Sequence, residues 1–115
     1  RAGVALYRVG YTKEIGGLRR FAFVDGGMAD NIRPALYGAR YTAVLANRMT
    51  EAADCAVTLA GRYCESGDVL INDAVFPAVR ADDIVAVAAC GAYAPALASN
   101  YNLSLRPAIV AVRDG

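Results

Sequence analysis

The sequence contains no histidine and no tryptophan, and its only lysine is Lys13. Without histidine, both the usual general base for a nucleophilic thiol and the commonest metal ligand are missing. The cysteines, Cys55, Cys64 and Cys90, are widely spaced and form no C-x-x-C pair, so we expect no metal site. Cys55 and Cys90 lie in apolar runs and are interpreted as buried packing residues. An odd number of cysteines indicates reduced thiols in a cytoplasmic protein.

The sequence also lacks an excess of one charge and any long apolar run. Twelve basic and 11 acidic residues are interspersed, for a net charge of +1. Proteins that bind nucleic acid neutralise phosphates with a concentrated basic surface, so nucleic acid is not an expected partner. The longest apolar runs, such as IVAVAAC at 84–90, fall far short of the roughly 20 residues that a membrane-spanning helix needs, so no membrane is expected either.

Apolar residues are nevertheless abundant, at 57% of the 115 residues. A small domain has much surface for its volume and should be more polar than average. Two interpretations stay open: a partner covers part of the surface, or the composition only reflects an alanine-rich sequence from a GC-rich genome. The chain starts with Arg1 and enters VALYRVGY almost at once. We interpret residues 1–115 as one domain of a longer protein.

Short β-rich runs dominate the chain. VALYRVGYTKEI (4–15) and LRRFAFVDGG (18–27) flank a Gly-Gly pair, which is typical of a hairpin. Further strands are predicted at 41–48, 54–61, 68–73, 82–90 and 108–112, and a short helix at 93–100. Short strands separated by turn residues predict an all-β fold, an antiparallel β-barrel or sandwich of the Greek-key kind.

The stretch GRYCESGD (61–68) interrupts this apolar pattern with polar, reactive side chains. A free cysteine thiol has a pKa of about 8.5, so a residue such as Cys64 can donate a proton without a histidine, and a neighbouring carboxylate such as Glu65 disfavours the thiolate. Adjacent strand residues point to opposite faces, so both reach one pocket only if the backbone bends, which Gly67 permits. From the residues alone, a functional cluster and an ordinary loop both remain open, and Asp68 is interpreted as a turn former.

Four ordered segments carry a resemblance to a known family. They are DGGMADNIRPALYGARY (25–41), GRYCESGD (61–68), GAY (91–93) and SNYN with RPA (99–108). With them the chain resembles, over nearly its whole length, the C-terminal domain of the diaminopimelate decarboxylase family, in the fold group of alanine racemase and ornithine decarboxylase. The resemblance implies an N-terminal (β/α)8 barrel whose lysine and glycine-rich loop hold pyridoxal 5'-phosphate. Lys13 does not match that lysine, so this domain alone is expected to be inactive.

The resemblance also implies roles for individual residues. Cys64 would reach across a homodimer interface into the partner's active site and donate a proton after carbon dioxide leaves. Glu65 would pair with the distal ammonium of the substrate. Arg33 and Tyr37 would bind the distal carboxylate, for which the planar arginine fork is suited. Tyr93 would lie near the cofactor and the substrate.

An amine and a carboxylate at the far end of one substrate match meso-2,6-diaminopimelate, so the resemblance implies its decarboxylation to L-lysine. The implied partners are the barrel of the same protein, a second subunit and the small amino-acid substrate. Ile109 departs from the family, which commonly has Glu there, and is interpreted as a packing variation. Two alternatives stay open: a domain of another pyridoxal phosphate decarboxylase, of the carboxynorspermidine or ornithine type, and a non-enzymatic dimerisation domain.

Overall fold

The computed structural model describes residues 3–113 of the chain and is built mainly of strands. The elements are β1 (Val4–Ile15), β2 (Arg19–Val24), α1 (Arg33–Tyr37), β3 (Ala43–Leu45), β4 (Cys55–Ala60), β5 (Val69–Phe76), β6 (Ile84–Ala88), α2 (Tyr93–Leu97) and the 3-10 turn η1 (Tyr101–Leu103). This content confirms the all-β class. In the described part of the chain, no helix is long and apolar enough to cross a membrane.

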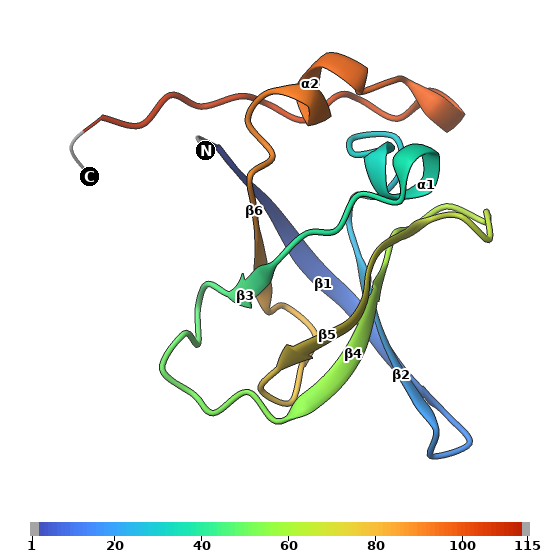
Figure 1. The fold of residues 1–115 in the computed structure, drawn as a ribbon, viewed down its shortest axis with the longest axis vertical. Coiled ribbons are helices and arrows are strands. Elements are labelled where there is room, and N and C mark those ends of the chain that lie inside the picture. Colours follow the sequence, from blue (N-terminus) through green and yellow to red (C-terminus); the bar gives the residue numbers. More distant parts are fainter. Residues whose placement is uncertain (1–2, 114–115) are drawn as a thin grey trace.

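The strands form a single curved sheet in the order β3-β6-β1-β2-β4-β5 (Figure 1). The long strand β1 pairs with β6 through Val4–Arg8 and with β2 beyond Val9, where a bulge shifts the register. The two edge strands, β3 and β5, also contact one another, so the sheet nearly closes into a barrel. β2 and β4 are parallel, unlike the other described pairs, because α1 and β3 intervene and bring the chain back in the same direction.

The core lies inside this curved sheet. Along β6, the buried Val85 and Val87 alternate with residues that are half-buried or exposed, as expected for a strand with one face toward the core. β4 is buried at four successive positions, so side chains on both of its faces are covered there. The largest fully buried side chains are Phe76, Leu45, Leu59, Val9, Val85 and Val87.

The hairpin at 4–27 is confirmed, as is the helix at the start of 93–100, which extends over Tyr93–Leu97. The strand predicted at 108–112 is wrong. These residues run as an exposed segment across the end of the domain that carries α2, away from the strand edges (Figure 1), and Ile109 is 80% exposed. A short apolar run becomes a strand only where a sheet edge is available to accept its hydrogen bonds.

The sequence did not predict α1. Proline occupies its first turn, where the missing N–H carries no penalty. Gly38 ends the helix with a φ of 62°, and its N–H donates to the carbonyls of Arg33 and Pro34. The cysteine predictions divide: Cys90 is buried, whereas Cys55 is only half-buried and its Sγ lies 3.1 Å from Nη1 of Arg20.

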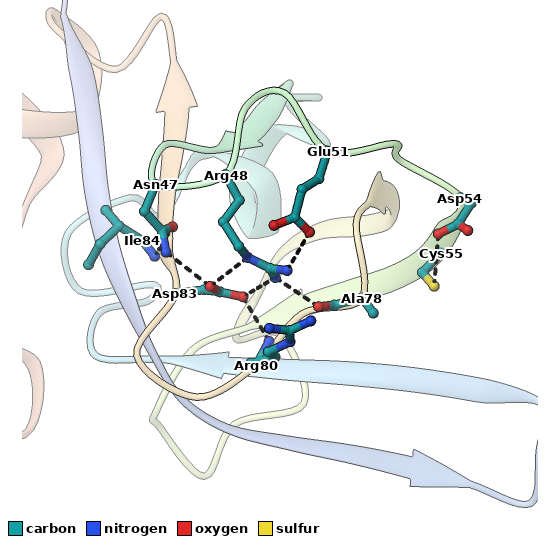
Figure 2. Close-up of polar contacts among 9 residues, drawn as sticks. All are labelled: Asn47, Arg48, Glu51, Asp54, Cys55, Ala78, Arg80, Asp83 and Ile84. Carbon is teal, nitrogen blue, oxygen red and sulfur yellow. Dashed lines mark hydrogen bonds and ion pairs between the residues drawn. The ribbon is translucent and has the colours of Figure 1, made fainter.

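At the opposite end of the sheet from α1, a buried carboxylate joins two loops (Figure 2). Asp83 is 4% exposed and binds the guanidinium of Arg48 through two hydrogen bonds, of 3.0 and 2.5 Å. It also accepts hydrogen bonds from Asn47 Nδ2 at 3.1 Å and from the Arg80 N–H at 2.8 Å. The residues after β3 are thereby fixed to the turn before β6.

Candidate active site at one end of the sheet

The end of the domain that carries α1 and α2 lies opposite the β1–β2 turn (Figure 1), and the segments that form it are rich in polar and aromatic residues. These segments are residues 25–37, which lead into and form α1, the loop 61–68 and residues 93–104. Backbone hydrogen bonds hold these segments together: the Ser99 N–H donates to Ala29 at 2.7 Å, and the Arg62 N–H donates to Gly26 at 3.1 Å. The end of the sheet therefore presents one continuous surface.

The loop 61–68 is irregular, as its sequence predicts. It makes a succession of bends and a turn between β4 and β5, in which the Asp68 N–H donates to the Glu65 carbonyl at 3.0 Å. Cys64 and Glu65 are both exposed. A Cβ added to Gly67 would lie 3.8 Å from that of Ala35 on α1, an ordinary packing distance. The loop that carries the thiol thus lies against the helix that carries Arg33.

Arg33, the first residue of α1, is half-buried and held from two sides. Its Cζ lies 5.4 Å from the centre of the Tyr93 ring, and its Nη1 donates to the hydroxyl of Tyr41 at 3.2 Å. The Tyr41 hydroxyl donates in turn to Oδ1 of the buried Asn31, at 3.4 Å. A single hydrogen bond uses one of five guanidinium donors, so the fork remains able to bind an anion.

Glu65 is held by a tyrosine that sequence reasoning did not select. The hydroxyl of Tyr101 donates a hydrogen bond to Oε1 of Glu65. The Tyr101 ring meets Tyr63 edge to face, with ring centres 5.4 Å apart. The hydrogen bond to Glu65 raises the pKa of Tyr101, so its hydroxyl keeps the proton that it donates. Tyr101 lies in the SNYN segment, which was the available signal.

Some of the predicted site residues are in direct contact, whereas others only lie at the same end of the sheet. Arg33 and Tyr93 are in contact. Tyr37 lies one turn further along α1, is 64% exposed and shares a helix face with Arg33. For Cys64 and Tyr37, the described residues show no hydrogen bond to another of the predicted site residues. A surface on which these side chains are exposed excludes water only if a second surface covers it.

Comparison with known proteins shows the family of the chain. The family described as pyridoxal-dependent decarboxylase, C-terminal sheet domain, matches residues 1–91. The chain belongs to this family. Among curated relatives, this sheet domain is 54% identical over 114 residues to the diaminopimelate decarboxylase of Bacillus subtilis and 56% identical over 117 residues to that of Actinosynnema pretiosum. The two alignments cover 99% and 100% of this chain, respectively, but only 26% of either relative.

The solved structures agree. The diaminopimelate decarboxylase of M. jannaschii, in complex with L-lysine, superposes on the sheet domain with a TM-score of 0.83 at 33% identity. The match covers 90% of this chain and 23% of that structure. The sheet domain thus spans about a quarter of the length of its relatives.

The residues at this end fit the edge of a pyridoxal site but not a whole one. Lys13 pairs with Phe21 in the β1–β2 hairpin, toward the other end of the sheet from the loop 61–68, so it lies outside this surface. Tyr93 is 67% exposed, with the Arg33 guanidinium against its ring, and can face a planar, anionic cofactor. No cluster of metal-binding side chains occurs in residues 3–113.

Proposed function

We propose that this chain is the C-terminal domain of a diaminopimelate decarboxylase, which converts meso-2,6-diaminopimelate to L-lysine and carbon dioxide. The observation that carries the proposal is the pair of opposite charges at one end of the sheet. Arg33 is anchored by Tyr41 and Tyr93, and Glu65 is anchored by Tyr101. The far end of diaminopimelate carries a carboxylate and an ammonium on one carbon, and it requires one partner of each sign.

Arg33 and Tyr37 bind the distal carboxylate in this proposal. The contacts of Arg33 with Tyr41 and Tyr93 fix the plane of the guanidinium before the substrate arrives. Preorganisation of this kind lowers the entropy lost on binding. Tyr37, one helical turn away, adds a hydroxyl on the same side.

Glu65 binds the distal ammonium. Its carboxylate keeps one orientation because Tyr101 donates to it. A carboxylate that accepts from a neutral tyrosine retains its negative charge and further acceptor sites. The substrate ammonium therefore finds an oriented anion rather than a freely rotating side chain.

Cys64 supplies the proton that replaces the lost carboxylate. It is exposed next to Glu65, and a thiol transfers a proton near neutral pH without help from histidine. The thiol acts in the site of a second subunit, in which the barrel of that subunit encloses it. The three cysteines are free in the structure, which suits a reducing, cytoplasmic location.

Exposed apolar side chains support the proposal that other parts of the enzyme cover this domain. Leu36 and Leu97 are 59% and 38% exposed on α1 and α2, and Val110 and Val112 are 78% and 81% exposed in the final segment. Such surface is costly in water and is usually covered in the functional assembly. We assign it to contacts with the N-terminal barrel and with the second subunit.

Pyridoxal 5'-phosphate, held mainly by the barrel, supplies the electron sink for the electrons of the broken carbon–carbon bond. Tyr93 would lie near the cofactor on the side of this domain. The remaining work of the sheet domain is to orient the substrate, exclude water and deliver the proton.

Activity on matched substrates tests the proposal in a full-length chain that carries this domain. L-Lysine equals diaminopimelate without the distal carboxylate. We expect kcat/KM for meso-diaminopimelate to exceed that for L-lysine on the order of 10⁴-fold. Arg33→Ala should reduce this ratio by about 10²-fold, because a buried carboxylate would lose its charged partner.

Arg19→Ala is the matched control, because Arg19 lies in the β1–β2 hairpin and packs on Phe21. It should leave the ratio unchanged. Preference for L-ornithine, L-lysine or carboxynorspermidine would support a related decarboxylase instead. The absence of any decarboxylation by a cofactor-loaded protein would support the dimerisation domain.

A further inference from the structure

A second carboxylate at this end of the sheet takes no part in the proposed chemistry. Asp68 closes the loop 61–68 and is 3% exposed. Its Oδ1 accepts the Met28 N–H and its Oδ2 accepts the Tyr63 N–H, both at 2.7 Å. None of the ion pairs in residues 3–113 includes Asp68. A buried carboxylate without a cation is costly unless it is hydrogen-bonded, so these two amides are what stabilise it.

Two glycines make room for this carboxylate. A Cβ on Gly27 would lie 2.4 Å from Oδ1 of Asp68, and a Cβ on Gly61 would lie 2.2 Å from Oδ2. Real Cβ atoms do not approach other atoms so closely, so any side chain at either position would push the carboxylate away. The backbone before α1 and the backbone after β4 therefore approach Asp68 from two sides.

We propose that Asp68 is a positioning residue of the decarboxylase site: its carboxylate fixes the loop that carries Cys64 and Glu65 relative to the segment that carries Arg33. The inference rests on the proposed function and deepens it. Sequence reasoning interpreted Asp68 as a turn former, and its N–H does close the turn from Glu65. In addition, its side chain holds the loop 61–68 against the segment that leads into α1.

Each hydrogen bond of Asp68 reaches a functional residue through a short, ordered path. The Tyr63 N–H lies one residue before Cys64. On the other side, Met28 opens a turn in which the N–H groups of Asp30 and Asn31 both donate to the Gly27 carbonyl, at 3.1 and 3.0 Å. That turn leads directly into α1. A displacement of either loop therefore changes the separation between the thiol and the guanidinium.

The two segments are not equally well anchored. The Asp30 carboxylate accepts the Gly27 N–H at 2.7 Å and the hydroxyl of the buried Tyr7 of β1 at 2.5 Å. The segment before α1 is thus tied to the sheet without Asp68. Among the described residues, the loop 61–68 is otherwise held by the Arg62 N–H bond to Gly26 and by two exposed side-chain bonds, from Arg62 to Ser104 and from Tyr101 to Glu65. Loss of the Asp68 carboxylate should therefore release chiefly the loop 61–68.

Hydrogen exchange and steady-state kinetics of Asp68→Asn test the inference in the full-length, cofactor-loaded protein. Asparagine keeps the shape but replaces one accepting oxygen with a donor. We expect amide exchange in peptides covering 61–68 to accelerate about tenfold, with a smaller change in 25–32. We expect kcat/KM for meso-diaminopimelate to fall by about 10–10²-fold with unchanged cofactor content, because a misplacement of about 1 Å has effects of this size.

Asp83→Asn is the matched control, since Asp83 is 4% exposed and lies at the other end of the sheet. It should leave both exchange in 61–68 and kcat/KM unchanged while the protein is folded. Gly61→Ala is the second variant. It retains Asp68 but displaces its carboxylate, so it should reproduce the effects of Asp68→Asn.

The proposal is overturned if Asp68→Asn changes only the unfolding temperature, as is expected of Asp83→Asn, and leaves exchange in 61–68 and kcat/KM as in the wild type. It is also overturned if Gly61→Ala leaves both at wild-type values. A folded, cofactor-loaded wild type that does not decarboxylate diaminopimelate refutes the proposed function, and the positioning role in the decarboxylase site with it. Exchange in 61–68 then still decides whether Asp68 holds the loop.

Discussion

Replacement of Asp83 by asparagine perturbs one buried carboxylate whose acceptor sites are all used. Its two oxygens receive hydrogen bonds from Asn47 Nδ2, from Nε and Nη2 of Arg48 and from the Arg80 N–H (Figure 2). In Asp83→Asn, one oxygen becomes an amide nitrogen, so two of these bonds are lost, and so is the charge. A hydrogen bond to a charged group contributes about 1.5–3 kcal/mol, which gives a loss of about 3–6 kcal/mol.

The lower end of this range applies because Arg48 keeps other partners. It still donates to Glu51 and to the Ala78 carbonyl, both at 2.8 Å. A loss of about 3 kcal/mol is a large part of the 5–15 kcal/mol that typically stabilises a domain. We therefore expect the midpoint of thermal unfolding of this chain, followed by circular dichroism, to fall by about 10 °C or more.

Asp82→Asn supplies the comparison for Asp83→Asn. The Asp82 carboxylate is 82% exposed and pairs with Arg8 at 3.5 Å, an exposed ion pair that contributes about 0–1 kcal/mol. Its midpoint should stay within about 3 °C of the wild type. If both variants shifted the midpoint by the same small amount, the buried cluster would not hold the two loops together as described.

Two further results are expected. Burial alone would raise the pKa of Asp83, but its hydrogen bonds to Arg48, Arg80 and Asn47 outweigh burial and lower it. The stabilisation is therefore present above the unfolded pKa of about 3.9 and is lost as pH falls through the lower folded value. When unfolding midpoints are measured from neutral pH to below that value, the midpoint of Asp83→Asn should fall less with decreasing pH than that of the wild type. Parallel curves would show that the Asp83 carboxylate does not contribute to the acid sensitivity. In the full-length enzyme, Tyr101→Phe should raise KM for meso-diaminopimelate several-fold, because Glu65 loses its hydrogen bond; an unchanged KM would remove Tyr101 from the site.

The hairpin and the all-β class could be predicted because their signals are local. A Gly-Gly turn between alternating runs and short apolar segments depend only on neighbouring residues. The segment 108–112 shows the limit of that approach. Its five residues are all apolar, as in a buried strand, but pairing depends on where the edges of the folded sheet lie, which no local pattern records.

The candidate site divides in a similar way. Cys64, Glu65 and Arg33 could be selected because their segments resemble a family. Asp68 and Tyr101 were missed because their tasks depend on contacts over long separations, from Asp68 to Met28 and from Tyr101 to Glu65. A buried carboxylate that accepts two backbone amides cannot be told from an exposed turn residue by its sequence neighbours.

The central claim, that this domain delivers Cys64 to the site of a second subunit, is tested most directly by mixing two inactive full-length chains. One chain carries Cys64→Ala, and the other lacks the barrel lysine that binds the cofactor. A dimer containing one of each has one site with both groups intact, so random reassortment should restore about a quarter of the wild-type sites. Recovery of activity toward that level is the expected result. If subunits exchange but no activity returns, each site is built within one chain, and the role of Cys64 across the interface is contradicted.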